Sequence, residues 1–190
     1  AIANDIIKIA AARELVNGIQ INTDKRILED FQKSAGFDYT KDQKRSIREI
    51  FADISSGRVM DRLLSGDVGF GKTEVAMNAM LAVILDGYQA IFVCPTTLLA
   101  TQHYHSMQKR FSEFGISIAK LDGKTPAKEK VHIKKGLASG EIKLVIGTHS
   151  LLEIQTNNLA LVIIDEEHKF GVKQKEKLKH LREDVHIVSM

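Results

Sequence analysis

From residue 63 onward, the sequence alternates short apolar runs with longer amphipathic segments. The runs predict strands at 63–65, 90–93, 116–121, 144–146, 159–164 and 185–188, and the segments between them predict helices at 72–86, 97–113, 127–139 and 172–183. This alternation is typical of βαβ units, which build a parallel sheet covered by helices on both faces. Because ligands of such α/β sheets bind at the carboxyl ends of the strands, we expect the functional side chains directly after the apolar runs.

The first 36 residues have a helical pattern. Ile2, Ile6 and Ile9 recur at about the helical period, and a cap cluster at residues 22–24 precedes a second short helix. Thr40 and Gln43 then have the spacing of a capping box, which opens a further helix that runs to about residue 57. We therefore expect a helical lead-in over residues 1–36 and one α/β domain over residues 37–190.

Composition limits the setting of the chain. Cys94 is the single cysteine, so no internal disulfide is possible and a reducing compartment is expected. No apolar stretch approaches the roughly 20 residues that a membrane span needs, and the N-terminus does not look like a signal peptide. The net charge of +3 permits contact with nucleic acid without demonstrating it. These features predict a cytoplasmic protein without a membrane partner.

A phosphate-binding motif, G-x-x-x-x-G-K-[ST], follows the first expected strand. Its residues are Gly66, Asp67, Val68, Gly69, Phe70, Gly71, Lys72 and Thr73. Backbone N–H groups of such a loop, together with the N-terminus of the next helix, bind phosphate. Lys72 would reach the β- and γ-phosphates and Thr73 would bind Mg²⁺. The alternative is a glycine-rich turn, which is what we expect of the second Gly-Lys-Thr, at residues 123–125, because Ile118 stands where the first glycine would be.

Acidic residues follow the apolar run 159–164. A carboxylate at a strand tip can hold the divalent ion of a nucleotide triphosphate, which is the role expected for Asp165. Glu166 could orient and deprotonate an attacking water. The alternative is that these acids only cap the following helix.

Taken together, these motifs resemble those of superfamily 2 helicases and translocases. Residues 66–73, 165–168 and 95–100 resemble motifs I, II and Ia of that superfamily, and residues 147–149 resemble motif Ib. The longer strings 60–76 and 165–172 resemble the translocase module of bacterial transcription-repair coupling factors. RecG-like fork-remodelling translocases are the next most similar group, and Phe70, Glu74 and Glu167 fit the coupling factors better.

The resemblance implies a fold, cofactors and partners. The fold would be a RecA-like P-loop domain, the first motor lobe of a translocase, with ATP and Mg²⁺ as cofactors. The partners would be the backbone of double-stranded DNA and, through other domains of a full-length bacterial protein, RNA polymerase and repair proteins. Gln43 would read adenine, although the capping box explains the same residue equally well. DNA contacts would fall on Thr96, Thr97, Thr148 and His149, and His168 would couple the nucleotide site to DNA or serve as a core histidine. Thr97 could also be a helix N-cap.

In that family the sequence continues into motif III and motifs IV to VI, which these 190 residues do not contain. The second lobe supplies an arginine that stabilises charge on the transferred phosphoryl group. We therefore expect an ATP hydrolase in the full-length protein, displacing stalled RNA polymerase, and weak ATP binding with little turnover in this chain alone. A RecG-like lobe, a stand-alone P-loop kinase or GTPase, and a non-catalytic nucleotide-binding scaffold are the alternatives.

Overall fold

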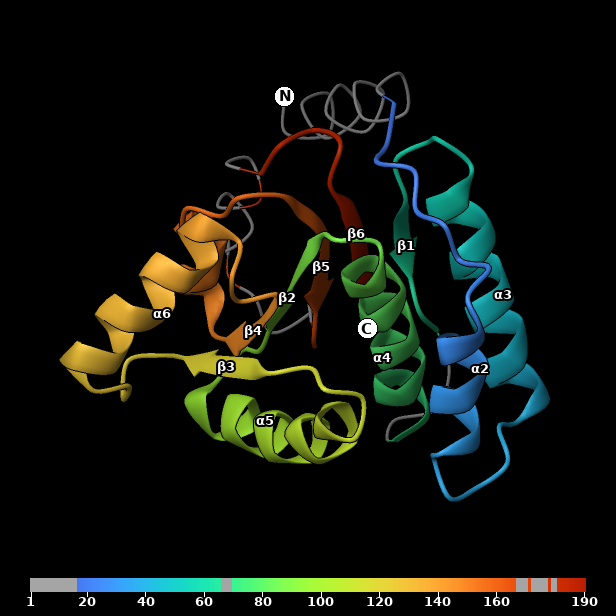
Figure 1. Cartoon of the computed structure of the whole chain (residues 1–190), viewed down its shortest axis with the longest axis horizontal. Coiled ribbons are helices and arrows are strands. Elements are labelled where there is room, and N and C mark those ends of the chain that lie inside the picture. Colours follow the sequence, from blue (N-terminus) through green and yellow to red (C-terminus); the bar gives the residue numbers. More distant parts are fainter. Residues whose placement is uncertain (1–16, 66–69, 167–170, 172–177, 179–180) are drawn as a thin grey trace.

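The computed structural model describes residues 17–65, 70–166, 171, 178 and 181–190. In these residues six strands form one parallel sheet with the order β1-β6-β5-β2-β4-β3. The strands are β1 (Asp61–Leu63), β2 (Gln89–Val93), β3 (Ile118–Leu121), β4 (Leu144–Gly147), β5 (Leu159–Ile164) and β6 (His186–Ser189). The parallel α/β sheet predicted from the alternating pattern is therefore confirmed (Figure 1).

The helices fill the connections between the strands. They are α2 (Arg26–Lys33), α3 (Lys41–Ser55), α4 (Phe70–Leu85), α5 (Thr97–Ser112), α6 (Ala127–Ser139) and the short 3-10 helix η1 (His149–Glu153). The expected helices at 72–86, 97–113 and 127–139 correspond to α4, α5 and α6. Most of the helix expected at 172–183 lies outside the described residues. No helix in the described ranges has the length and apolar character needed to cross a membrane.

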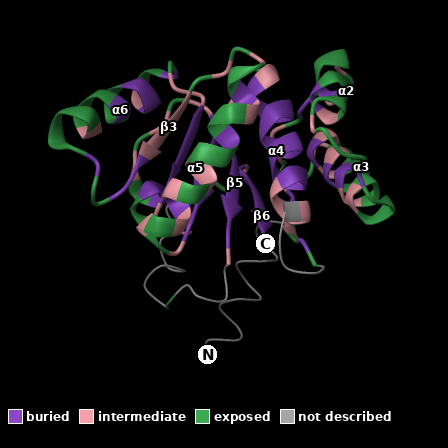
Figure 2. Ribbon diagram, turned by 90° about the horizontal axis from the view of Figure 1, so that it is seen from below, coloured by how far each residue is buried: buried purple, intermediate pink, exposed green. Residues whose placement is uncertain are grey.

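Two apolar clusters cover the two faces of the sheet. One joins α2, α3, α4 and α5 to one face, through residues such as Phe31, Met80 and Phe92. The other joins α6 and η1 to the opposite face, through residues such as Leu137, Leu151 and Val162. Figure 2 shows the consequence, with buried strands at the centre and exposed residues on the outer sides of the helices. The sheet is therefore covered on both faces, as the continuous apolar runs predicted.

Helix α4 is the central helix of the larger cluster. Every residue from 74 to 84 along it is buried. A helix that is apolar on all sides needs neighbours on all sides, and α4 has them because it packs against α2, α3, β2 and β5. This packing fixes the position of α4, whose first turn belongs to the expected phosphate-binding motif.

The N-terminal helices differ in how they begin. Helix α3 has the complete capping box: the Thr40 hydroxyl accepts from the Gln43 N–H at 3.1 Å, and the Gln43 carbonyl oxygen accepts from the Thr40 N–H at 2.8 Å. Helix α2 begins after Lys25, which makes no side-chain cap. The expected cap cluster instead forms a turn, in which Asn22 Oδ1 accepts from the Asp24 N–H at 3.0 Å.

Strand β1 begins two residues earlier than predicted. The prediction followed the apolar pair Leu63 and Leu64, but only Leu64 is buried, and Leu63 is 67% exposed. β1 is an edge strand that pairs with β6 alone, and its three residues are exposed or half-buried, so it carries no continuous apolar run. The Leu64 N–H still donates to the Ser189 carbonyl at 2.8 Å, so the pairing with β6 extends to Leu64.

Candidate nucleotide-binding site and its comparison with known proteins

The candidate motifs meet at one edge of the sheet. Because all strands are parallel, the segments that follow β1, β2, β4 and β5 leave the sheet on the same side. Backbone hydrogen bonds continue the pairing into these segments: the Asp165 N–H donates to the Val93 carbonyl at 2.8 Å, and the Cys94 N–H donates to the Gly147 carbonyl at 2.8 Å. The segments that follow β5, β2 and β4 are thus neighbours at this edge, and the segment that follows β1 leaves the sheet at the same edge.

The described part of the phosphate-binding motif is the first turn of α4. Gly71, Lys72 and Thr73 are half-buried there, at the helix N-terminus, where backbone N–H groups have no partner within the helix. Gly66, Asp67, Val68 and Gly69 lie outside the described residues, and Phe70 is described only by its backbone. The described residues thus include the predicted strand before the motif and the predicted helix that starts within it.

Gln43 combines two contacts. Its side-chain oxygen caps α3, and its Nε2 lies 3.4 Å from the Gly71 carbonyl oxygen. A Cβ atom at Gly71 would lie 3.4 Å from the same Nε2, so a side chain at Gly71 would crowd this contact. The capping role is confirmed, and the side chain also contacts the turn that carries Lys72.

Asp165 is held by a histidine that the sequence did not single out. Its carboxylate follows β5, is 7% exposed, and has Oδ2 2.8 Å from His103 Nε2. His103 comes from α5, and its ring lies 4.9 Å from the ring of Phe92 on β2. A carboxylate restrained in this way keeps a fixed position at the sheet edge, as a metal ligand requires.

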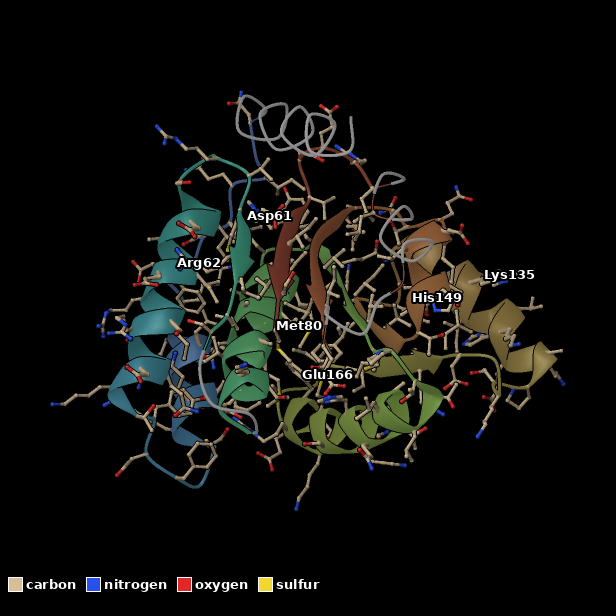
Figure 3. The ribbon with its side chains drawn as sticks, turned by 180° about the vertical axis from the view of Figure 1, so that it is seen from behind. Asp61, Arg62, Met80, Lys135, His149 and Glu166 are labelled. Carbon is tan, nitrogen blue, oxygen red and sulfur yellow. The ribbon has the colours of Figure 1, made fainter. Side chains whose placement is uncertain are left out.

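Glu166 has an unusual backbone conformation. Its φ of 52° is positive, and among the described residues it is the only non-glycine residue with this property. Left-handed backbone costs an L-residue about 1–2 kcal/mol, and such strain concentrates at functional sites. Figure 3 shows Glu166 at the edge of the sheet from which α5 begins. The strain favours a functional role over simple helix capping.

Cys94 adjoins the two acids. It is fully buried at the end of β2, and burial together with the negative charges of Asp165 and Glu166 raises the pKa of its thiol far above the usual range. The thiol is therefore protonated at neutral pH and is a poor nucleophile.

The segment after β2 begins with a helix cap. The Thr96 hydroxyl accepts from the Leu99 N–H at 3.2 Å, so Thr96 is the N-cap of α5 and Thr97 is the first helical residue. The expectation that Thr97 caps the helix in addition to contacting DNA was wrong as to the cap, because Thr96 occupies the N-cap position. Thr96 is exposed and Thr97 is half-buried at the helix N-terminus, where phosphate can bind.

Thr148 and His149 follow β4, beside the segment that follows β2. Both are half-buried at the start of η1, and Figure 3 shows His149 on the side of the molecule that carries α6. The preceding Gly147 is required sterically, because a Cβ atom there would lie 1.9 Å from the Leu121 carbonyl oxygen. The close pairing of β3 with β4 therefore fixes the position of the backbone that leads from Gly147 into Thr148.

A buried polar network sits behind the phosphate-binding turn. Glu74 follows Thr73 directly, accepts from the Tyr39 hydroxyl, and has both carboxylate oxygens 2.6 Å from Arg110 Nη1. Arg110 Nη2 also donates to the Phe31 carbonyl oxygen at 2.9 Å, and its guanidinium lies 4.2 Å from the centre of the Phe31 ring. Burial and the Glu74 carboxylate raise the pKa of Tyr39 to about 12. The network ties α2, α4 and α5 together one residue away from Thr73.

Two further sequence expectations concern other segments. His168 lies outside the described residues. The second Gly-Lys-Thr forms the predicted turn, in which Asp122 Oδ1 accepts from the Lys124 N–H at 2.8 Å and the Thr125 hydroxyl accepts from the Asp122 N–H at 3.1 Å.

His103 and Arg110 are the site-forming residues that sequence reasoning missed. Both lie on α5 and contact residues of other elements, His103 at a sequence separation of 62 and Arg110 at a separation of 36. A histidine and an arginine in a helix rich in polar residues carry no spacing signal. Only the fold brings them to Asp165 and Glu74.

The chain matches the family model described as DEAD/DEAH box helicase over residues 40–190. It is similar to the transcription-repair-coupling factor of Helicobacter pylori strain J99, with 51% identity over the whole of this chain and 19% of that protein. It is also similar to RecG in the solved structure of RecG bound to a three-way DNA junction, with 42% identity, a TM-score of 0.85, and coverage of 96% of this chain and 25% of that chain.

A more distant likeness concerns the fold. The structure of Saccharomyces cerevisiae Dbp5 bound to Nup159, Gle1, IP6 and ADP matches 87% of this chain and 45% of that chain, with 18% identity and a TM-score of 0.65.

The chain spans about a fifth of the length of the curated coupling factor that it matches. These matches confirm the RecA-like helicase fold and the resemblance to superfamily 2 motors expected from the sequence. A helicase domain implies nucleotide binding with a divalent metal. The chain belongs to the DEAD/DEAH box helicase family.

Proposed function

We propose that this chain binds Mg·ATP as the first motor lobe of an ATP-dependent translocase on double-stranded DNA. The observation that carries the proposal is the restrained Asp165, which lies at the same sheet edge as the α4 turn bearing Lys72 and Thr73. Oxygen ligands are the ones that Mg²⁺ prefers, and the Thr73 hydroxyl and the Asp165 carboxylate supply them. The donor set therefore fits the ion.

Each site residue has a proposed role. Lys72 neutralises the β- and γ-phosphates, Glu166 orients the attacking water, and Gln43 contacts adenine from its place beside Gly71. Backbone amides of the phosphate-binding loop would be supplied by Gly66, Asp67, Val68, Gly69, Phe70 and Gly71. Bound Mg²⁺ would neutralise charge that develops on the transferred phosphoryl group.

The DNA-contacting residues are proposed to be Thr96, Thr97, Thr148 and His149, with His168 as the coupling residue. Hydroxyls, an imidazole and a helix N-terminus bind phosphates without reading bases, as movement along arbitrary sequence requires. The support is spatial: the segments carrying these residues follow β2 and β4, whose ends are neighbours at the sheet edge. Residues 1–36 would form a helical lead-in to the lobe over residues 37–190.

In the full-length protein we propose displacement of stalled RNA polymerase and coupling of transcription to repair. The support is the similarity to transcription-repair-coupling factors along the whole chain. A RecG-like fork-remodelling lobe is the second candidate, favoured by the TM-score of 0.85 to RecG bound to a three-way junction. Preference of the full-length protein for a three-way junction over linear duplex, without binding to RNA polymerase, would support this second candidate.

Thermal unfolding tests the nucleotide proposal. A ligand at ten times its dissociation constant stabilises the folded state by about 1.4 kcal/mol, so Mg·ATP is expected to raise the melting temperature and Mg·GTP is expected to raise it less. Phosphate release from this chain is expected to be negligible, because the arginine of a second lobe is needed for hydrolysis. Equal stabilisation by both nucleotides would argue for a GTPase, and no stabilisation would argue for a non-catalytic scaffold.

A further inference from the structure

Three different metal-ligating groups meet at the carboxyl ends of β2 and β5. One ligand atom from each of Cys94, His103 and Asp165 lies within 4.8 Å of the other two. They come from three elements: Cys94 from the end of β2, Asp165 from the end of β5, and His103 from α5. Strands β2 and β5 are paired with Val93 opposite Ile164, so Cys94 and Asp165 are the next pair along. The ring of His103 packs on Phe92, two residues before Cys94 and on the same face of β2.

We propose that Cys94, His103 and Asp165 form a binding site for a thiophilic divalent transition metal, with Zn²⁺ as the preferred ion. Thiolate and imidazole are ligands that Zn²⁺ favours and that Mg²⁺ does not. Three protein ligands leave the fourth tetrahedral position for water, as in catalytic zinc sites. This site is therefore distinct in chemistry from the Mg²⁺ site, although the two share Asp165.

The ligand atoms lie within 4.8 Å of one another, so their side chains must shift to hold the ion. With Zn–S near 2.3 Å and Zn–N near 2.0 Å, the ligand atoms of a tetrahedral site lie about 3.5 Å apart. His103 Nε2 and Asp165 Oδ2 are already 2.8 Å apart, so the ion would enter between them and replace their hydrogen bond. Their side chains are 19% and 10% exposed, which leaves an approach from solvent even though Cys94 is buried.

Charge balance favours occupation. Binding releases the thiol proton to solvent and forms the metal–sulfur bond, so one thiolate and one carboxylate neutralise the two positive charges of the ion. Two negative charges next to one another in a buried place are costly without a cation.

Zn²⁺ and the Mg²⁺ of Mg·ATP cannot both bind the Asp165 carboxylate at the same time. Zn²⁺ would take the Asp165 carboxylate that Mg·ATP needs, so zinc is expected to inhibit nucleotide binding. This consequence rests on the proposed function, whereas zinc binding itself does not.

Cobalt spectroscopy of the 190-residue chain tests the site. Cys94 is the single cysteine, so a thiolate-to-cobalt charge-transfer band on adding Co²⁺ to the reduced, nucleotide-free chain can come only from Cys94. We expect this band at one Co²⁺ per chain, its loss on adding Zn²⁺, and its persistence in excess Mg²⁺. Bound Co²⁺ without the band would overturn the proposal.

Variants identify the other ligands. His103→Ala is expected to weaken Zn²⁺ binding at least about 10-fold in competition with a chromophoric chelator. His105→Ala, an exposed histidine on the same helix, is expected to leave it unchanged. Cys94→Ser should abolish the band, and circular dichroism checks that each variant is folded. Equal zinc affinity in the two histidine variants would contradict the proposed zinc site. A cobalt band in a chain that fails to bind Mg·ATP would reject the proposed function and leave the zinc site standing.

Discussion

His103 Nε2 lies 2.8 Å from Asp165 Oδ2, and this contact joins α5 to the end of β5. The same helix begins at Thr97, with Thr96 as its cap, where we propose that DNA phosphates bind. A single helix therefore carries proposed DNA contacts at its start and a restraint on the proposed metal ligand two turns later. Movement of α5 would displace both together.

Removing the imidazole should weaken nucleotide binding. For His103→Ala we expect the dissociation constant of Mg·ATP to rise about 10–100-fold, because a ligand that loses its orienting partner binds metal less well. His103→Gln, whose amide Nε2 can donate to Asp165, should recover part of the loss. Calorimetric titration measures the dissociation constant of Mg·ATP for the unaltered chain and for each of the two variants. His105→Ala is the matched control, and an effect there as large as at His103 would rule out a specific role.

The buried ion pair between Arg110 and Glu74 should dominate the stability of the region behind the phosphate-binding turn. Their side chains are 15% and 5% exposed, so Arg110→Ala leaves a buried carboxylate without its cation. We expect the free energy of unfolding to fall by about 3–5 kcal/mol. Arg45→Ala removes the exposed ion pair with Asp42 and should lower the free energy of unfolding by at most about 0.5 kcal/mol. Urea titration measures the free energy of unfolding of both variants. Similar losses in the two variants would contradict the assignment of a buried pair.

Tyr39 should make stability depend on alkaline pH. Its pKa is raised from the ordinary value of 10.0 to about 12 in the folded chain, because burial and the Glu74 carboxylate disfavour the phenolate. The folded state therefore holds the proton longer, so this contribution is complete below pH 10 and is lost as the pH rises toward 12. Spectrophotometric titration should show one of the three tyrosines ionising late. Tyr39→Phe should remove that step, and Tyr104→Phe should retain it.

Glu166 should show a conflict between stability and function. Its φ of 52° strains a residue with a Cβ atom, so Glu166→Gly is expected to raise the free energy of unfolding by up to about 1 kcal/mol. Hydrolysis in the full-length protein should fall sharply, because the carboxylate that we propose to orient water is lost. Glu113→Gly, at a φ of −63°, should instead destabilise by about 0.5–1 kcal/mol. If Glu166→Gly lowered the free energy of unfolding as much as Glu113→Gly does, backbone strain at Glu166 would be refuted.

The sequence predicted the sheet because parallel strands buried on both faces must be continuous apolar runs, and β2, β4 and β5 are completely buried. It also predicted where Lys72, Asp165 and Thr148 would lie, since a parallel topology brings the carboxyl ends of all strands to one edge. It missed the start of β1, because an edge strand tolerates the exposed Leu63. It missed His103 and Arg110, because their partners are set by how α5 packs and not by spacing along the chain.

The most direct test of the nucleotide site compares two lysines in the same tripeptide. Lys72 and Lys124 both follow a glycine and precede a threonine, but of the two only Lys72 lies in the first turn of a helix, at the proposed phosphate site, while Lys124 lies in a turn closed by Asp122. Calorimetric titration with Mg·ATP should show binding to the unaltered chain and to Lys124→Ala, and a large loss of affinity in Lys72→Ala. Equal affinity in the two variants would contradict the account.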